Sequence, residues 1–195
     1  MAAAFNEQER EAIVRRLRDA ARRCAATIGM KNTTLEQLAR EAGISKSAFY
    51  RFYDSKERLF LDILEEWHTA IYGSAAAVLE ARAALPLRTR VAQAILEAAR
   101  VMSEGDTMAL FAQDLPAMLR RLPPEVVQAH YDSDDQHIER LIDRAGVRLR
   151  VSRETACAII RILFMSLFQR AEVGAHYQQA LEALVYSACE QIIAE

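Results

Sequence analysis

The chain has 195 residues, of which 52% are hydrophobic and 27% are charged, with six glycines and four prolines. This length can bury roughly 70% of the unfolded surface, enough for one ordinary domain or for a small domain and a larger one. The N-terminal residues lack the basic and then apolar run of a signal peptide. The longest charge-free run, residues 67–79, is shorter than the ~20 residues of a membrane span, so we expect a cytoplasmic protein without a membrane partner.

The formal net charge is −2, but residues 1–64 carry +3 and the remainder −5. A basic end supports binding to DNA, although a difference this small is only supporting evidence. The three cysteines lie far apart and show no metal-ligand spacing, so we expect buried thiols and no metal or cofactor. Because GxSxG, P-loop, GxGxxG and HExxH motifs are missing, we do not expect an enzyme.

The first predicted element is one amphipathic helix over residues 7–28, ended by Gly29. Five arginines lie mostly off its apolar stripe: Arg15, Arg16, Arg18, Arg22 and Arg23. A solvated surface is the favoured interpretation of these arginines, and contact with DNA phosphates is the alternative.

Residues 33–59 predict two short helices joined by a tight turn, followed by the start of a third helix. Thr34 with Gln37 fits the capping-box spacing at the start of the first of these helices, and Thr33 with Glu36 fits it equally well. The sequence therefore predicts the helix but leaves its register open by one residue.

A glycine at position 43 suits the end of that helix, and Ser45 suits the N-cap of a second helix through Tyr53. The exposed first turn of the second helix is small and basic, as a recognition helix in the major groove requires. Lys56, in the first turn of the next helix, opposes the helix dipole and therefore suggests an external anion.

These features resemble the DNA-binding signature of the TetR family of bacterial transcriptional regulators. The residues that carry the resemblance are Thr34, Ala39, Gly43, Ile44, Ser45, Phe49, Tyr50, Tyr53, Ser55, Lys56, Glu57 and Leu59. Two positions depart from the family pattern, with Ser47 where glycine is frequent and Phe52 where histidine or tyrosine is frequent. Phenylalanine cannot hydrogen-bond a phosphate.

The resemblance and the helix geometry together predict contacts with double-stranded DNA at a near-palindromic operator. Three side chains are expected on phosphates: Thr34, Tyr50 and Lys56. Four are expected at or near base edges: Ser45, Lys46, Ser47 and Arg51, with a phosphate as the alternative for Arg51. Two recognition helices about one DNA turn (~34 Å) apart would read the two half-sites.

The remaining pattern predicts further helices, punctuated by Pro86, Pro123–Pro124 and glycines, over 55–79, 91–105, 107–119, 125–145, 152–172 and 177–194. No strand pattern is found. We therefore predict an all-α fold of about nine helices. A three-helix DNA-binding domain would span residues 1–54, and a ligand-binding and dimerisation domain would span residues 55–195.

The last two predicted helices could fill the core or could pair with their copies in a four-helix bundle, and periodicity does not decide between these arrangements. The TetR resemblance implies the second arrangement, because the last two helices of that family dimerise. The homodimer interface would then include Ile160, Leu163, Leu167, Leu181, Leu184 and Ala188.

The resemblance also implies a cavity for a small-molecule effector among the C-terminal helices. Large aromatic and flexible side chains would suit an apolar or aromatic molecule, although such residues are more often plain core. The expected contacts are Trp67, Met102, Phe111, Tyr131, His137 and Phe168. His130, Asp134 and His137 share a helix face, but solvent exposure is favoured over metal binding.

The sequence thus predicts a ligand-responsive repressor that releases its operator when the effector binds. A rival hypothesis is a helical small-molecule-binding or interaction protein whose helix-turn-helix does not function. A regulator should bind a palindrome far more tightly than random duplex, which separates the two hypotheses.

Overall fold

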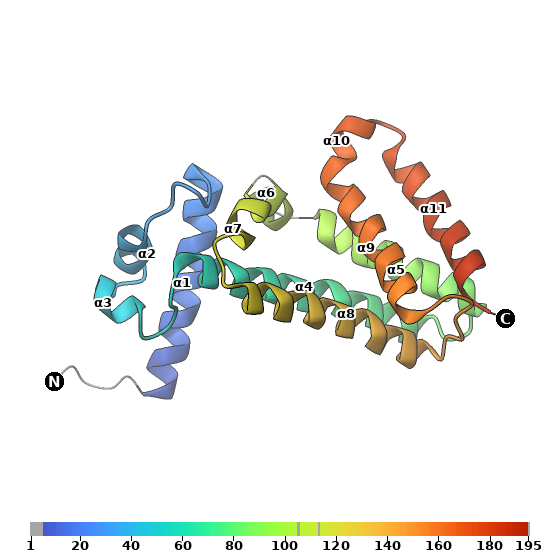
Figure 1. Cartoon of the computed structure of the whole chain (residues 1–195), viewed down its shortest axis with the longest axis horizontal. Coiled ribbons are helices and arrows are strands. Elements are labelled where there is room, and N and C mark those ends of the chain that lie inside the picture. The colour runs from blue at the N-terminus through green and yellow to red at the C-terminus, as the bar shows by residue number, and fades with distance from the viewer. Residues whose placement is uncertain (1–5, 105, 113, 195) are drawn as a thin grey trace. The chain divides into compact units, whose positions relative to one another are not determined.

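The computed structural model describes residues 6–104, 106–112 and 114–194, which are predominantly helical (Figure 1). The helices are α1 Glu7–Ile28, α2 Leu35–Glu41, α3 Lys46–Phe49, α4 Lys56–Ala81, α5 Leu87–Ser103, α6 Asp106–Ala112, α7 Leu115–Leu119, α8 Pro124–Ala145, α9 Arg153–Ser166, the 3₁₀ helix η1 Leu167–Gln169, α10 Arg170–Val173 and α11 Tyr177–Ile192. In these described ranges no strand occurs, and one isolated antiparallel bridge joins Leu149 to Ile193. The all-α prediction is confirmed.

The nine predicted helical segments are all present, and two of them are subdivided. The segment 107–119 contains α6 and α7, because Pro116 suits the first turn of a helix and cannot continue one. The segment 152–172 contains α9, η1 and α10. There the Ser166 hydroxyl donates to the carbonyl of Leu163 at 2.7 Å, a bond that competes with the helical ladder. The predicted helix end at Gly105 lies outside the described residues.

The described chain forms two compact units, and each contains two separate stretches of sequence. Unit 1 comprises residues up to 66 together with 109–127, and unit 2 comprises residues 67–108 together with those from 128 onward. The start of α4 thus belongs to unit 1 and its remainder to unit 2. The functional boundary at 54/55 stays a prediction, since compactness alone does not define a function.

The core of unit 1 forms where α1, α2, α3 and the start of α4 place their apolar residues together. Leu17, Leu38, Phe49 and Leu59, one from each helix, are fully buried. The capping box of α1 is complete, because Asn6 accepts from the N–H of Glu9 while the carboxylate of Glu9 accepts from Asn6. Unit 1 is therefore a small three-helix bundle extended by α4.

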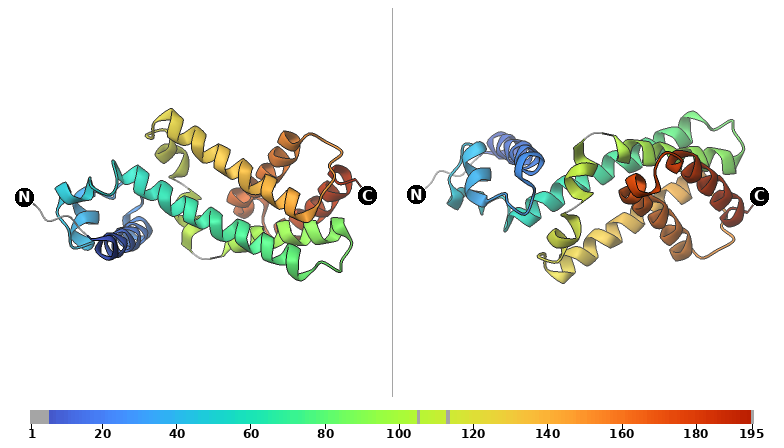
Figure 2. Two further views of the ribbon diagram at one scale, coloured as in Figure 1. Left: turned by 90° about the horizontal axis from the view of Figure 1, so that it is seen from below. Right: turned by 90° about the horizontal axis from the view of Figure 1, so that it is seen from above.

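Unit 2 is built from the long part of α4 with α5, α8, α9 and α11. Helix α11 packs against α5 and α9 (Figure 2). The described helices include none that is both long enough and apolar enough to cross a bilayer.

Candidate nucleic-acid interface and internal cavity

The second helix of the helix-turn-helix, α3, has Ser45 as its N-cap. Its Oγ accepts a hydrogen bond from the N–H of Ala48 at 3.1 Å and lies 2.9 Å from Oγ of Ser47. Gly43, with φ of 72°, reverses the chain before the cap, in a conformation that a side chain would strain. Because the cap uses the Ser45 hydroxyl, any base contact by Ser45 must compete with the helix start.

Of the two threonines that could cap α2, Thr34 is the N-cap. Its Oγ1 accepts from the N–H of Gln37 at 3.2 Å, and Oε1 of Gln37 accepts from the N–H of Thr34 at 2.9 Å. Thr33 is instead buried and donates to the carbonyl of Gly29 at 2.9 Å. Thr34 therefore lies at an exposed helix start, where a phosphate could approach.

The exposed surface of α3 carries Lys46, whose Nζ lies 2.5 Å from a carboxylate oxygen of Glu36. The carboxylate raises the pKa of Lys46, and the ammonium lowers the pKa of Glu36. Both side chains are more than half exposed, so the pair is weak and DNA can compete for the lysine. Ser47, Tyr50 and Arg51 are exposed beside it. We call this set, Lys46, Ser47, Tyr50 and Arg51, the α3 edge.

Lys56 departs from the sequence-based interpretation. Its Nζ donates to the carbonyls of Met30 at 3.0 Å, Lys31 at 2.9 Å and Thr33 at 2.6 Å. An ammonium has three N–H groups, so all of them are used. Burial lowers the pKa of this ammonium. Carbonyl dipoles thus supply the negative partner that the sequence attributed to an external anion, and a direct phosphate contact would require breaking these bonds.

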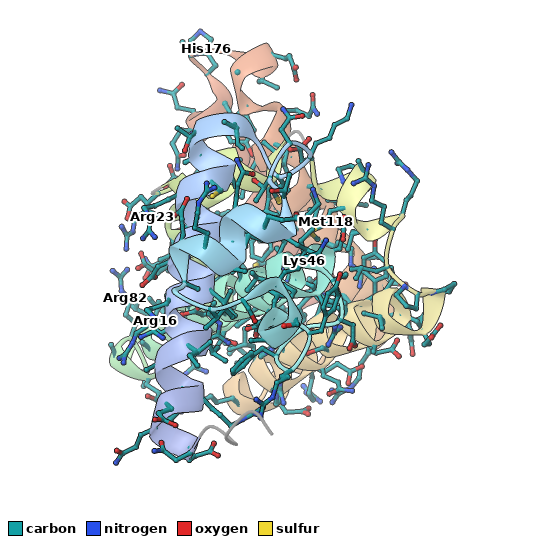
Figure 3. The ribbon with its side chains drawn as sticks, turned by 90° about the vertical axis from the view of Figure 1, so that its left-hand side faces the viewer. Arg16, Arg23, Lys46, Arg82, Met118 and His176 are labelled. Atoms are coloured by element: carbon teal, nitrogen blue, oxygen red, sulfur yellow. The ribbon has the colours of Figure 1, made fainter. Side chains whose placement is uncertain are left out.

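The arginines of α1 are mostly engaged within unit 1 rather than simply solvated. Arg18 donates two hydrogen bonds of 2.8 Å to Asp62, which also accepts from the hydroxyl of Tyr53. Burial alone would raise the pKa of Asp62, but these two donors hold it below its usual value. Arg16 donates to the carbonyl of Ala42 at 2.9 Å. Arg22 pairs with Glu66 and Arg23 pairs with Glu41. In Figure 3, Arg16 and Arg23 lie along α1, away from Lys46.

Unit 2 contains an apolar cavity of about 60 Å³. Its lining comes from α4, α5, α8, α9, the end of α11 and the segments that follow α8 and α11: Tyr72, Ala75, Leu79, Val91, Ala94, Ile95, Ala98, Ile138, Leu141, Ile142, Ala145, Val147, Leu149, Ala156, Ile160, Phe164, Ile192 and Ile193. Alanines recur on several facing helices, and their short side chains leave the space that larger residues would fill. The cavity is therefore suited to an apolar group.

One wall of the cavity adjoins a buried polar cluster between α4 and α8. The hydroxyl of Tyr72 donates to Oδ1 of Asp134 at 2.5 Å, and Nδ1 of His68 lies 3.3 Å from the same oxygen. His68 stacks on His130 with 5.2 Å between ring centroids, and Tyr72 stacks on His137 at 4.9 Å. Burial lowers the pKa of His68 to about 4, against the opposing charge of Asp134. In the part of the chain that is described, no group of three or more His, Cys, Asp or Glu residues could hold a metal ion.

The comparison with known families concerns the helix-turn-helix. The family described as "Bacterial regulatory proteins, tetR family" matches residues 17–63, which include α2, α3 and the α3 edge. Residues 17–63 therefore form a DNA-binding region of the TetR family. Among curated proteins, no significant match was found.

Solved TetR-family structures share the fold over nearly the whole chain. A TetR-family transcription regulator from Marinobacter aquaeolei VT8 is 18% identical, with a TM-score of 0.61 over 97% of this chain and 100% of that one. A regulatory protein of the TetR family from Rhodococcus RHA1 is 21% identical, with a TM-score of 0.62 over 94% and 98% of the two chains. RolR, solved in complex with the ligand resorcinol, is 17% identical, with a TM-score of 0.60 over 95% of each chain.

None of the six residues expected to contact a ligand lines the cavity. Trp67, Met102 and Phe111 are buried, and Tyr131 is 41% exposed. His137 stacks on a cavity residue, Tyr72, and Phe168 is half-buried. Large side chains fill space, so they were a poor guide to a void. Alanines at helical spacing on facing helices would have been the better signal.

The residues expected at the dimer interface differ in their exposure. Leu163, Leu167 and Leu181 are buried within the protomer, and Ile160 lines the cavity. Leu184 is 59% exposed, and Ala188 is half-buried. Periodicity identified the apolar stripes of α9 and α11 but not which edge of each stripe faces outward. From α9 onward, the large apolar residues that are exposed in the described chain are Ile162, Met165, Val173 and Leu184.

Proposed function

We propose that this TetR-family protein is a homodimeric repressor that binds a near-palindromic operator and releases it when an apolar or aromatic small molecule binds unit 2. The observation that carries the proposal is the α3 edge, where the four-residue helix α3 and the two residues after it present Lys46, Ser47, Tyr50 and Arg51 to solvent. Hydroxyl and cationic groups of this kind bind base edges and phosphates. No catalytic step is part of the proposal.

Dimerisation is supported by the outward surface of α9 and α11. Ile162 is 66% exposed and Met165 is 62% exposed, which is unusual for neighbouring large apolar residues on a soluble surface. Leu184 on α11 is exposed as well. A second copy packed on these helices in a four-helix bundle would cover them. The dimer would bring two α3 edges to the half-sites of one operator.

Effector binding is supported by the apolar cavity and by its size. A volume of about 60 Å³ corresponds to about two water molecules, whereas ligand pockets usually measure ~300–1,000 Å³. An effector must therefore bind a state in which the surrounding helices have separated. A molecule that binds the expanded state more tightly would shift the protein toward it. The structurally similar RolR binds resorcinol, which fits an aromatic effector.

The α4 helix offers a route from the cavity to the α3 edge. Its later turns contribute Tyr72, Ala75 and Leu79 to the cavity, while its first turn holds Lys56 on the carbonyls before α2. A displacement of α4 by an effector would therefore act on the loop that leads into the helix-turn-helix. This change would alter the spacing between the two recognition helices.

The test begins by selecting bound fragments from random duplex DNA. Binding of the selected duplex and of a scrambled duplex is then measured by fluorescence anisotropy at several salt concentrations. We expect the selected sequence to be palindromic and to bind at least 10³-fold more tightly. Equal affinity for both duplexes would instead favour the rival hypothesis of a non-functional helix-turn-helix.

The effector part of the proposal requires a separate measurement. Small apolar and aromatic molecules are screened for release of the selected duplex, with Ala98→Phe as a variant whose cavity is filled by a larger side chain. The wild type should release DNA with at least one compound, and the filled variant should bind DNA but fail to release it. Release of equal size from both proteins would exclude the cavity as the effector site.

A further inference from the structure

Arg10, on the second turn of α1, lies over the aromatic ring of Phe52. The guanidinium carbon is 5.2 Å from the ring centroid, within the ~6 Å range of cation–π attraction. Phe52 follows directly after the α3 edge, and its N–H donates to the carbonyl of Phe49 in that helix. The ring therefore fixes a cation from α1 beside the C-terminal end of the recognition helix.

The charge of Arg10 is available to an outside ligand. No carboxylate lies within ion-pair distance of this guanidinium among residues 6–104, 106–112 and 114–194, whereas other arginines of α1 have partners: Arg16, Arg18, Arg22 and Arg23. Contact with an aromatic ring uses one face of the planar guanidinium and leaves its N–H edges free to donate. Those edges match the oxygens of a phosphate in a bidentate contact.

The guanidinium also borders a groove of about 350 Å³ in unit 1, large enough to admit an anionic group and its water. The groove is lined by Arg10, Val14, Arg18, Phe52, Tyr53, Asp54, Arg58, Asp62 and Glu65. The negative charge of Asp62 is compensated by Arg18, and its carboxylate also accepts from Tyr53. Among the other lining residues, the negative charges of Asp54 and Glu65 offset the positive charges of Arg10 and Arg58. The groove as a whole therefore does not attract a free anion. A phosphate contact at Arg10 therefore needs the rest of the DNA to be held by α3.

We infer that Arg10 binds a phosphate of the DNA backbone at the end of the recognition helix, positioned by Phe52. This inference rests on the proposed function. A helix of four residues is ~6 Å long and the major groove is ~12 Å wide, so a group just beyond the end of α3 meets the flanking backbone. Arg10 lies outside the segment that matches the family, residues 17–63. Arg10 would supply a phosphate contact beside a position where Phe52 cannot form a hydrogen bond.

The experiment measures DNA affinity against salt for the full-length wild type and for Arg10→Ala and Arg15→Ala. Arg15 is the matched control, because it is an exposed arginine of the same helix about 140° away around the axis. Loss of one phosphate contact per protomer should reduce the slope of log affinity against log salt by about 2 per dimer. Between 50 and 200 mM salt, the wild type should then lose about tenfold more affinity than Arg10→Ala.

The role of the ring is tested with Phe52→Leu and the double variant. If Phe52 positions Arg10, Phe52→Leu should also weaken binding, and adding Arg10→Ala should cause little further loss. Circular dichroism shows whether each variant is folded. If Phe52→Leu does not fold, Arg10→Ala by itself still tests the phosphate contact. Equal slopes for Arg10→Ala and wild type, or equal losses in Arg10→Ala and Arg15→Ala, would overturn the inference while leaving the proposed function intact. A wild type that binds no duplex would overturn both.

Discussion

Replacing Lys56 by methionine separates a structural role of this residue from a DNA-contacting role. Methionine keeps the length of the side chain but removes the ammonium that binds the carbonyls of Met30, Lys31 and Thr33. Two of these bonds are partly buried and one is exposed. Counting ~1.5 kcal/mol for each partly buried charged bond, and discounting for water that can reach the freed carbonyls, the loss is about 2 kcal/mol.

The loss is measured by urea unfolding, with Lys46→Met as the control. Lys46 makes one exposed ion pair, so its removal should leave the unfolding midpoint unchanged. Lys56→Met should shift the midpoint to lower urea without changing the slope m, since the folded surface is the same. In DNA binding, the salt dependence of Lys56→Met should match that of the wild type. A variant of wild-type stability whose salt slope falls by about 2 per dimer would refute the structural role and support a phosphate contact.

Three further predictions concern the dimer, the buried histidine and the recognition helix. Ile162→Arg should make the protein monomeric in analytical ultracentrifugation, because it would bury an unpaired charge in the proposed interface; Ile28→Arg, on an exposed isoleucine of α1, should stay dimeric. The pKa of His68 is about 4 when folded and ~6.5 when unfolded, so the unfolded state binds more protons between these values. The free energy of unfolding should therefore fall by up to about 3 kcal/mol as the pH drops from ~6.5 to ~4. This decrease should be smaller in His68→Gln and the same as in the wild type in His176→Gln. Glu36→Gln frees the α3 lysine and should tighten DNA binding about twofold in an anisotropy assay, whereas weaker binding would show that the pair positions the lysine.

Local sequence patterns were a sound guide wherever the structure depends on neighbouring residues. Ser45 caps α3, and Gly43 has the positive φ that the turn requires. Both follow from backbone rules that act over three or four residues. The register between Thr33 and Thr34 was open, since either hydroxyl fits the capping spacing. Packing decided it by burying Thr33 against α1.

Long-range partners were not accessible in this way. The charge of Lys56 was evident in the sequence, but its partners lie 23–26 residues earlier in the chain. The same limit applies to Arg18, whose partner Asp62 is 44 residues away. A sequence reveals that a charge needs a partner, and only the fold shows which group is close enough to be that partner.

The sequence by itself determined the helical class, the ends of most helices and the position of the helix-turn-helix, because each depends on short-range periodicity and capping. The tertiary structure alone decided where unit 2 is hollow, which edge of α9 and α11 stays exposed, and that Arg10 lies on Phe52. Those properties depend on the distances between side chains remote in sequence. An alanine such as Ala98 contributes to a cavity only when the helices facing it also present small residues there.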